Sequence, residues 1–447
     1  MSQMQIRDVI HGSISVDSHE LPVIDSKYFQ RLRQIRQVGF AESSFPSATH
    51  NRFIHSLGAM ETATQAFDAV FRNTETHSET ILSASKKERF RQTLRLAALL
   101  HDIGHGPLSH TTEFSMPDIK ELRLPAALNS LLKGKPRKAT HEDYTLKMIL
   151  DSGLTPLIQK AGLTHGVTPV HVAALIEPRL PVTDDFFIEG IDFRPILAQL
   201  ISSEIDADRM DYLRRDSLYT GVSYGQFDFN WLLSNLTYHS WNGKCYLSLQ
   251  HRALYAFEDF LISRFHMFLM VYFHHKSVVY DEMLAQYFSS KDCNYRLPTD
   301  IEEYCEHDDA HLYAHLAKSQ NEWARRIFLK RPYQILIELH SGIPATKTAR
   351  TEQELLLNKI KEALKIKGVH YLEVTSISEL SKYFRKPADP IFVRYDNYYS
   401  TSSFIPLEQC TDLFQRYGEK RSITRLYVAP ENIAACRELS PHLPLNY

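Results

Sequence analysis

The sequence predicts a mainly α-helical protein with a small β-hairpin and a smaller C-terminal α/β region. Apolar residues recur at helical spacing through most of the first 290 residues. Beyond that point, three runs rich in β-branched and aromatic residues have strand character. We therefore expect two regions, a helical core over residues 1–290 and a helical and α/β region over residues 291–447.

Composition and charge limit the classes of protein to which this chain can belong. The formal net charge is −2, so a broad basic field for coating nucleic acid is not indicated, and a local nucleic-acid contact stays open. The five cysteines are scattered without a Cys-x-x-Cys pair, which indicates reduced thiols and no zinc knuckle. The apolar run at 257–273 contains Glu258, Asp259 and Arg264, so we expect a buried helix and no membrane contact. The reduced thiols predict a cytoplasmic location.

The first helices are predicted from capping residues and apolar spacing. Ser26 can cap a helix whose apolar positions run from Phe29 to Val38, with a polar face that is expected to be solvated. Thr140 with Asp143 fits a capping signature at the start of another helix. Further helices are expected at residues 51–71, 85–103 and 203–216.

The second half of the chain is predicted to hold a hairpin, one long helix and then shorter elements. Asn242-Gly243 lies between two strand-like runs and predicts a two-residue turn in a hairpin over 236–249. The stretch 251–289 is apolar on most faces and predicts one long buried helix, on which Arg264 and Tyr272 share a face. Past residue 293 we expect helices at 300–306, 309–318, 321–329, 353–367 and 407–417, and strands at 369–374, 390–395 and 425–429.

The stretch 99–110 gathers histidines and a carboxylate in a way that packing does not explain. An apolar helix delivers the adjacent pair His101 and Asp102, and a Gly-His-Gly-Pro run then ends that helix. His105 follows His101 by four residues, so the two imidazoles are predicted to share a helix face. His110 lies past the break. Three histidines and a carboxylate within ten residues favour a metal site.

Four groups from separate helices are candidate metal ligands, namely His55, His101, Asp102 and Asp208. Two imidazoles and two carboxylates suit one divalent transition metal, Mn, Fe, Ni, Co or Zn, better than Mg. Such a metal lowers the pKa of water and offsets charge on a phosphoryl oxygen. Further candidates for phosphate contact and proton transfer are His105, His110, His141, Arg52, Arg209 and Arg264. The residues by themselves indicate a metal-dependent phosphohydrolase.

Two charged stretches leave alternatives open. On the predicted helix at 203–216, Arg209, Tyr212 and Asp216 fall on one stripe, which suits a lined pocket and a salt-bridged surface helix about equally. The basic loop at 131–140 either attracts a polyphosphate or is simply solvated; its cations are Lys133, Lys135, Arg137 and Lys138.

Four motifs carry a resemblance to a known family: Ile10-His-Gly, His50-Asn-Arg-Phe-Ile-His55, Leu100-His-Asp-Ile-Gly-His-Gly-Pro-Leu-Ser-His110 and Ile205-Asp-Ala-Asp-Arg-Met-Asp211. They resemble the HD-domain metal phosphohydrolases, most closely the deoxynucleoside triphosphate triphosphohydrolase (dNTPase) branch, which includes vertebrate antiviral restriction enzymes. The resemblance covers about residues 5–290. It implies an all-α HD core that hydrolyses a dNTP to a deoxynucleoside and inorganic triphosphate, by attack of metal-activated water on the α-phosphorus, with Mg on the triphosphate.

The resemblance also implies roles for residues near the metal. The four candidate ligands named above match the metal ligands of the family. His110, with Glu113 where the family has an Asp, matches the acid that protonates the leaving 5′ oxygen. His105 and His141 match contacts to the α-phosphate.

The same resemblance extends to the substrate pocket. Tyr272 would crowd the ribose 2′ position and so favour deoxy substrates, and Phe273 replaces a polar Gln beside the base, which leaves base preference open. The residues that match contacts to the triphosphate, the sugar and its 3′-OH are Arg52, Arg209, Tyr212, Arg264, Gln37 and Asp216.

A regulatory nucleotide is implied by a second group of matches. Asp25, Gln30 and Arg33 match residues that hold an activating guanine nucleotide, which reopens the interpretation of that polar helix face as merely solvated. The implied partners are a dNTP substrate, an activating GTP or dNTP, and further copies of the chain in a homodimer or homotetramer. The family's second activator site is matched poorly in this sequence, because Trp231, Gln250 and Ala256 stand in place of its basic or amide residues.

Two other classes of function compete with a dNTPase. One is a different HD enzyme, a phosphodiesterase or a single-strand nuclease. The pocket set Arg209-Tyr212-Asp216-Arg264-Tyr272 argues against it, because a nuclease has no need of a pocket sized for a free nucleoside triphosphate. The other is a nucleotide sensor, which a degenerate site would support, whereas all four candidate ligands and His110 are present.

Overall fold

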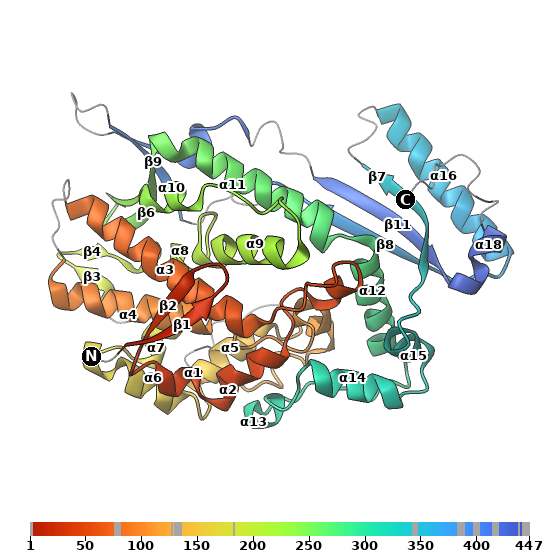
Figure 1. Ribbon diagram of the computed structural model, residues 1–447, viewed down its shortest axis with the longest axis horizontal. Helices are drawn as coiled ribbons and strands as arrows, with labels where there is room; N and C mark the ends of the chain where they lie inside the picture. The colour runs from red at the N-terminus through yellow and green to blue at the C-terminus, as the bar shows by residue number, and fades with distance from the viewer. Residues whose placement is uncertain are drawn as a thin grey trace.

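The computed structural model describes residues 3–75, 82–126, 128, 136–181, 184–341, 347–381, 389–396, 403–413, 420–436 and 439. Helices make up most of these residues, and the described strands form three sheets, so the prediction of a mainly α protein with an α/β region is confirmed. In Figure 1 the helical bundle fills the left and centre. The C-terminal three-stranded sheet and its long helix lie at the right.

A bundle of helices forms the main hydrophobic core. Helix α3 (Arg52–Glu75) packs against both α4 (Ala84–Leu100) and α9 (Ala207–Thr220). Ser83 caps α4, and α5 (His141–Leu150) begins at the predicted capping box of Thr140 and Asp143. The other helices are α1 (Leu21–Ile24), α2 (Lys27–Gln30), α6 (Thr155–Gly162), α7 (Pro169–Ile176), α8 (Arg194–Gln199), α10 (Phe229–Ser234), α11 (Leu254–Met267), α12 (His275–Ser289), α13 (Ile301–Tyr304), α14 (Asp309–Lys318), α15 (Glu322–Phe328), α16 (Lys347–Ile366) and α18 (Ile433–Cys436).

The described strands pair within three separate sheets. β1 (Gln3–Asp8) and β2 (Gly12–Asp17) form an antiparallel pair. The second sheet has the order β10-β9-β6-β4-β3, with β5 on β6, and its strands are β3 (Phe187–Ile188), β4 (Ile191–Asp192), β5 (Leu236–Trp241), β6 (Lys244–Gln250), β9 (Phe392–Tyr395) and β10 (Ser403–Pro406). The third has the order β7-β11-β8, with β7 (Gln334–His340), β8 (Tyr371–Ser378) and β11 (Arg421–Val428).

The predicted hairpin is confirmed and gains partners from distant parts of the chain. Asn242 and Gly243 have φ values of 51° and 72°, as a two-residue turn requires. β9 runs parallel to β6, with Ser248 opposite Phe392. A C-terminal strand therefore extends the sheet that begins with the hairpin.

The predicted helix at 85–103 is shorter than expected and ends at Leu100. A neighbouring helix binds the backbone just past this end, because the Thr145 hydroxyl donates to the carbonyl of His101 at 3.1 Å and accepts from the N–H of Gly104 at 3.0 Å. The N–H of His105 bonds to the carbonyl of Asp102 instead of continuing the helix. The prediction that His101 and His105 share a helix face is therefore wrong.

Two other predicted helices are interrupted. The stretch 251–289 divides into α11, a π-helical turn over Phe268–Tyr272, and α12, because the N–H of Phe273 bonds to the carbonyl five residues earlier. The helix expected through Val38 ends as a 3₁₀ turn at Gln34, because the carbonyl of Ile35 accepts a hydrogen bond from the N–H at the start of α3.

Residues on both sides of position 290 pack in the main core. The Tyr304 hydroxyl donates to the carbonyl of Gly104 at 2.8 Å, and Asp309 accepts from the N–H of Leu108 at 2.7 Å. The division of the chain at residue 290 stays a prediction. Residues 414–417 of the predicted helix 407–417, and Lys133 and Lys135 of the basic loop, lie outside the described residues.

Candidate metal centre and active-site pocket

Three helix ends bring the four candidate ligands to one place. His55 lies in the first turn of α3, and Asp208 lies in the first turn of α9, whose start is fixed by the capping carboxylate of Asp206. The pair at 101–102 follows the last residue of α4. The three ends meet beside the core of the bundle, where His55 and Asp102 are buried and His101 and Asp208 are partly exposed.

The four side chains surround a common space. Nε2 of His55 lies 3.0 Å from Oδ1 of Asp208 and 3.5 Å from Oδ2 of Asp102. Nε2 of His101 lies 3.5 Å from Oδ1 of each of these two carboxylates. Ligand atoms of His55, His101 and Asp208 all lie within 4.8 Å of one another, the spacing expected of groups that share one cation.

Hydrogen bonds at the far side of each imidazole direct Nε2 toward this space. Nδ1 of His55 lies 2.8 Å from Oδ2 of Asp211, and Nδ1 of His101 lies 2.7 Å from the carbonyl oxygen of Ala98. Within the described ranges, both Nε2 atoms are buried and have no hydrogen-bond partner. Buried acceptor nitrogens that lack partners and face carboxylates fit a divalent transition metal.

Asp102 joins the candidate centre to a second group of polar residues. Burial disfavours its charge, but the Arg52 guanidinium, which forms an ion pair with it, and His101 hold the pKa of Asp102 well below its usual range. Burial and the charge of Arg52 lower the pKa of His105, so that imidazole is neutral. Nε2 of His105 lies 3.2 Å from Oδ1 of Asp102.

Three histidines and a glutamate form this second group. The ring of His105 stacks on that of His141 at 3.8 Å, and the ring of His110 meets His105 edge-on at 4.7 Å. Glu113 lies 3.0 Å from Nδ1 of His110 and also contacts Nδ1 of His141. Burial opposes its charge, but these two hydrogen bonds lower the pKa of Glu113 to about 2.

A cavity of about 430 Å³ opens beside Asp208 and His110. The stripe on α9 lines it, so Arg209, Tyr212 and Asp216 belong to a pocket and not to a salt-bridged surface. Nine residues expected at the site line this cavity, namely Gln37, Arg52, His110, Asp208, Arg209, Tyr212, Asp216, Arg264 and Tyr272. These nine residues come from four distant stretches of the sequence, which the fold brings together around one cavity.

Buried carboxylates hold the polar side chains of the pocket in place. Glu204 accepts from Arg209 at 2.9 Å and from Arg264 at 3.1 Å, and it is buried. Asp216 contacts Nε2 of His50 at 2.7 Å and accepts from the Tyr272 hydroxyl at 2.8 Å. Because these donors are fixed before any ligand arrives, the pocket is organised in advance to receive an anion.

Three polar atoms of the pocket are buried without a hydrogen-bond partner in the described part of the chain. They are Nε of Arg264, Oε1 of Gln37 and Oγ of Ser277. An unpaired buried donor or acceptor costs about 1–3 kcal/mol. A ligand that hydrogen-bonds to these atoms would recover that free energy.

The expected regulatory residues lie elsewhere. The Gln30 amide donates to the carbonyl of Ile24 at 2.8 Å and accepts from Nε of Arg33 at 2.7 Å. The Arg33 guanidinium lies over the ring of Phe53 at 3.6 Å, and Asp25 is exposed. None of the three lines the metal centre or the adjoining cavity.

Comparison with known proteins agrees with this geometry. The HD domain model matches residues 52–215, which contain all four candidate ligands, and a model of an HD associated region matches residues 227–341. This chain is an HD-domain protein. HD domains bind divalent metals, and the cluster of His55, His101 and Asp208 is a suitable place for one.

Relatives and a solved structure extend the comparison. The HD-domain chain is 30% identical over 332 residues to the uncharacterized protein MJ1154 of Methanocaldococcus jannaschii, which covers 74% of this chain. It is 29% identical over 300 residues, 67% of this chain, to the deoxynucleoside triphosphate triphosphohydrolase SAMHD1 homolog of Dictyostelium discoideum. A hypothetical protein from Aquifex aeolicus has the same fold, with a TM-score of 0.71 and 25% identity over 98% of this chain and 100% of the other.

The matches establish homology to dNTPases within the HD-domain phosphohydrolases. The chain spans 59% of the length of the Methanocaldococcus protein and 51% of the Dictyostelium protein. No helix among the described residues is both long enough and apolar enough to cross a membrane.

Sequence reasoning missed the carboxylates that support the HD centre. Asp211 orients His55, and Glu204 holds the two pocket arginines. The one sequence signal for Asp211 is its place three residues after Asp208 on the same predicted helix. The structure adds that its carboxylate is fully buried. Glu204 precedes the helix, and no spacing rule connects it to Arg264.

Proposed function

We propose that this HD-domain protein hydrolyses deoxynucleoside triphosphates to a deoxynucleoside and inorganic triphosphate. The observation that carries the proposal is one continuous cavity, which joins the candidate ligand Asp208 to two arginines and to the paired Asp216 and Tyr272. The arginines would bind the triphosphate, and the polar pair would bind the sugar. The phosphorus atom that is hydrolysed would lie beside the metal held by Asp208.

The chain's own residues divide the work of binding and orientation. Arg209 and Arg264, fixed by Glu204, hold the phosphate oxygens that do not react. Arg52 reaches both Asp102 and the cavity, so it lies between the metal centre and the bound phosphates. When bound, a divalent metal supplies Lewis acidity that activates water and offsets charge on the α-phosphate.

Proton transfer to the leaving 5′ oxygen is assigned to His110. Its side chain is 68% exposed, and it lines the cavity from the second group of histidines. The Glu113 carboxylate accepts a hydrogen bond from Nδ1–H of His110, which fixes the orientation of the imidazole ring. Nε2 of His110 is then left to carry the transferred proton. His105, neutral and held by Asp102, offers an uncharged contact to the α-phosphate.

Recognition of the sugar is assigned to the group around Asp216. Its carboxylate is held by His50 and by the Tyr272 hydroxyl. A 3′-OH can donate to this carboxylate, while Gln37 offers an unpaired buried oxygen close by in the same cavity. We assign to the Tyr272 ring the exclusion of a 2′-OH, which would favour deoxy substrates.

Product analysis on the purified chain tests the proposal. Each dNTP and NTP is incubated with Mn or Mg, with and without a second nucleotide, and the products are separated by chromatography. We expect a deoxynucleoside and intact inorganic triphosphate from wild type and from His165→Ala, a histidine outside the cavity. His101→Ala should release neither.

Two other results would redirect the assignment. Cleavage of cyclic nucleotides or oligonucleotides, with every free triphosphate left intact, would make the chain an HD phosphodiesterase or nuclease. A protein that binds metal and nucleotide but turns over none of these substrates would be a nucleotide sensor.

Activation and assembly belong to the same proposal. Homology to dNTPases supports an activating GTP or dNTP held by Asp25, Gln30 and Arg33, and a homodimer or homotetramer. A cytoplasmic location stays a prediction. Arg33→Ala should lose activation and keep basal turnover, and retention of full activation would remove the regulatory site from the proposal.

A further inference from the structure

The turn that carries His110 has a strained backbone. Leu108 has a φ of 55° and Ser109 a φ of 61°, so two consecutive residues adopt the left-handed conformation that favours glycine. All three residues line the active-site cavity. Strain of this kind persists only where neighbouring groups hold the backbone in place. The turn therefore depends on the hydrogen bonds that reach it from other segments.

Asp309 supplies two of these hydrogen bonds from the second half of the chain. It lies in the first turn of α14, and its Oδ1 accepts from the N–H of Leu108 at 2.7 Å. Its Oδ2 accepts from the N–H of Arg36 at 3.0 Å. Leu108 comes two residues before His110, and Arg36 comes immediately before Gln37. One carboxylate thus joins two segments that lead into the active-site cavity.

Further hydrogen bonds fix the same turn. The Ser109 hydroxyl donates to the carbonyl of Arg36 at 2.5 Å and accepts from Nε of Arg52 at 2.7 Å. Two residues further on, the Thr111 hydroxyl donates to Oδ1 of Asp281 on α12 at 2.8 Å. Carboxylates from both α12 and α14 therefore hold the strained turn.

The Asp309 carboxylate is buried without a compensating charge. The residue is 7% exposed, and in the part of the chain that the structure describes no cation forms an ion pair with it. The Arg36 guanidinium pairs with Glu42 instead, at 2.7 Å. Burial raises the pKa of Asp309 to about 6, although the two backbone N–H groups favour the charged form. Burying a charge in this way is unfavourable, and the backbone groups that it binds account for its place.

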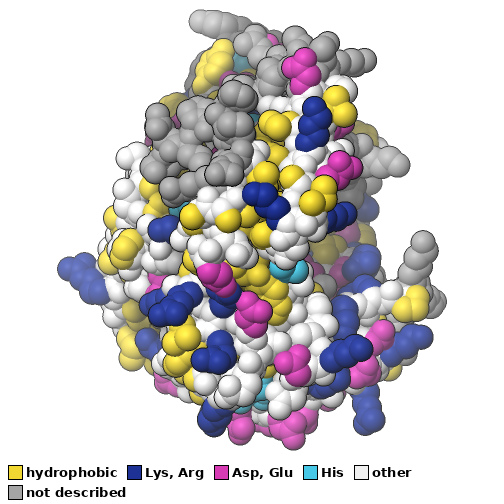
Figure 2. Space-filling view, turned by 90° about the vertical axis from the view of Figure 1, so that its right-hand side faces the viewer, with side chains coloured by type: hydrophobic (Ala, Val, Ile, Leu, Met, Phe, Trp, Pro, Cys, Tyr) yellow, Lys and Arg dark blue, Asp and Glu magenta, His cyan; other side chains and the backbone are white. Residues whose placement is uncertain are grey.

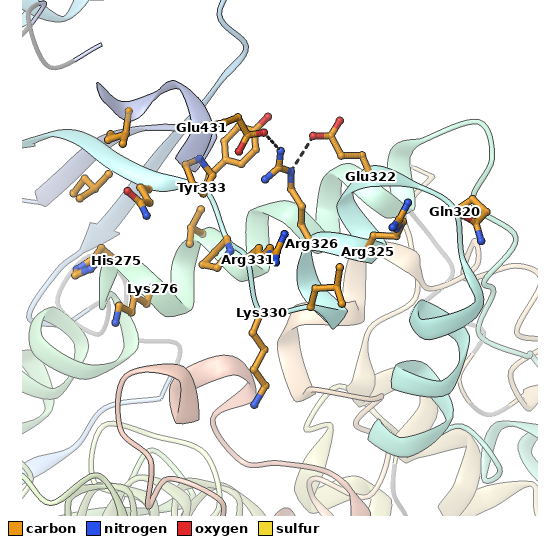
Figure 3. Close-up of a pocket in the computed structure, with 17 residues that line it drawn as sticks. His275, Lys276, Gln320, Glu322, Arg325, Arg326, Lys330, Arg331, Tyr333 and Glu431 are labelled. Atoms are coloured by element: carbon orange, nitrogen blue, oxygen red, sulfur yellow. Dashed lines mark hydrogen bonds and ion pairs between the residues drawn. The ribbon is translucent and has the colours of Figure 1, made fainter. Parts of the chain in front are cut away.

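The two carboxylates face the active-site cavity and not the surface. α12 and α14 lie at the right-hand edge of the helical bundle in Figure 1, and Figure 2 views the molecule from that side, where Lys and Arg side chains are frequent. Asp281 lines the active-site cavity, and Asp309 binds the turn beside it. His275 and Lys276, at the start of α12, line the larger cavity drawn in Figure 3, and no residue lines both cavities.

We propose that Asp309 is a positioning residue, through which the HD associated region holds the turn of His110 at the active site. Asp309 and Asp281 lie within the match of the HD associated region, whereas His110 lies within the match of the HD domain. Asp309 does not line the cavity, so it acts only through the backbones of Leu108 and Arg36. The role of His110 as the acid rests on the proposed function, and the hydrogen bonds of Asp309 do not.

Asp309→Asn, made in the full chain, tests the inference. The amide keeps one oxygen acceptor and turns an N–H donor toward the other backbone N–H, so one of the two hydrogen bonds is lost. The matched control is Asp192→Asn, because Asp192 is also buried and accepts from a backbone N–H, that of Arg194 at 2.9 Å, outside the cavity. Asp309→Ser, which removes the buried charge, replaces the amide variant if that variant melts early.

Hydrogen exchange followed by mass spectrometry examines the turn without any substrate. In Asp309→Asn, we expect peptides that contain the amides of Leu108 and Arg36 to exchange at least about tenfold faster than in wild type, because a hydrogen bond to a charged acceptor is lost. The same peptides in Asp192→Asn should exchange as in wild type. Unchanged exchange in Asp309→Asn overturns the inference, whether or not the chain hydrolyses dNTPs.

Steady-state kinetics on the dNTP that wild type hydrolyses measures the consequence for catalysis. Asp309→Asn should lower kcat about 10–100-fold and leave KM nearly unchanged, because the acid is displaced while the arginines that bind the triphosphate stay in place. Asp192→Asn should keep both constants. An unchanged kcat, or an equal loss in Asp192→Asn, overturns the inference. A wild-type chain that turns over no dNTP contradicts the proposed function, and hydrogen exchange then still decides whether Asp309 holds the turn.

Discussion

At the scale of single residues, Asp211 connects the metal centre to a buried network of charges. Its carboxylate contacts His55 and His11 and forms an ion pair with Arg215, which in turn pairs with Asp8. Asp211 and Arg215 are fully buried. The ligand geometry of the HD centre and the stability of α9 therefore depend on one side chain.

Asp211→Asn should weaken both metal binding and folding. The amide no longer orients His55 as an anion does, and we expect metal affinity to fall about 10–100-fold. Arg215 keeps only Asp8, so the free energy of unfolding should fall by about 3 kcal/mol. Chelator competition and urea unfolding measure the two effects.

Asp68→Asn is the matched control for that substitution, since Asp68 pairs with Arg91 on the surface. Exposed pairs contribute about 0–1 kcal/mol, so little change is expected. An Asp211→Asn protein with the metal affinity of wild type would show that Asp211 has no role in orienting His55.

Glu113 gives the second group of histidines a pH dependence. Its lowered pKa means that the folded state favours the carboxylate, so its contribution to stability is complete above the ordinary value of 4.5 and is lost as pH falls toward about 2. The cause is the pair of hydrogen bonds from His110 and His141. This pH dependence of stability comes from Glu113 alone, so replacing Glu113 measures it.

Glu113→Gln should be about 1–2 kcal/mol less stable than wild type at pH 7, because two hydrogen bonds to a charged acceptor are weakened. That difference should shrink steadily below pH 4.5. Urea unfolding at a series of pH values measures it. Glu142→Gln, an exposed neighbour, should follow wild type at every pH, and a constant gap for Glu113→Gln would refute the proposed linkage.

At the scale of elements, the contact between α3 and α9 explains a glycine within a helix. A Cβ added at Gly58 would overlap Oδ1 of Asp211 and Nη2 of Arg215. Only glycine lets α3 approach α9 closely enough for His55 and Asp208 to face each other. Helix propensity alone disfavours glycine there by about 1 kcal/mol.

Gly58→Ala should therefore destabilise the protein despite the better helix propensity of alanine. We expect a loss of about 2–4 kcal/mol, because neither buried side chain can move without breaking its ion pair. Gly12→Ala is the comparison, since its Cβ meets nothing but φ is 71°, and it should cost about 1 kcal/mol. Thermal unfolding ranks the two variants, and an equal cost would contradict the close contact.

The interrupted helix between α11 and α12 shows how an element can differ from its sequence pattern. The apolar stretch predicts one continuous helix, and the structure has a π-helical turn at Phe268–Tyr272. This turn carries three residues that line the active-site cavity, Phe268, Val271 and Tyr272. A π-helical turn contains one residue more than an α-helical turn, and the spacing of apolar residues does not reveal it. The place of Tyr272 in the pocket therefore follows from the family resemblance and not from helical geometry.

At the scale of the whole molecule, the second half of the chain packs closely with the first. The core that surrounds the HD centre includes Tyr304, Leu312 and Leu316, and β9 extends the sheet of β6. Removing residues 291–447 would expose these core positions. Small domains cannot lose so much buried apolar surface and remain folded.

We expect a chain of residues 1–290 to lose its cooperative thermal transition, whereas a chain of residues 1–341 keeps one at a lower temperature. The longer chain keeps α13 to α15, which the shorter one lacks, and loses β8 to β11, α16 and α18. Circular dichroism during heating measures both. A 1–290 chain that melts as the full chain does would establish the predicted division at residue 290.

The sequence by itself determined the helical class, the hairpin at Asn242-Gly243, the capping box at Thr140 and the residues of the candidate centre. These follow from spacing, turn chemistry and residue type, which are local properties. Only the tertiary structure decided that α4 ends before His101 and that Asp211 and Glu204 support the site. Such contacts join residues far apart in the chain, and no local periodicity encodes the distance between them.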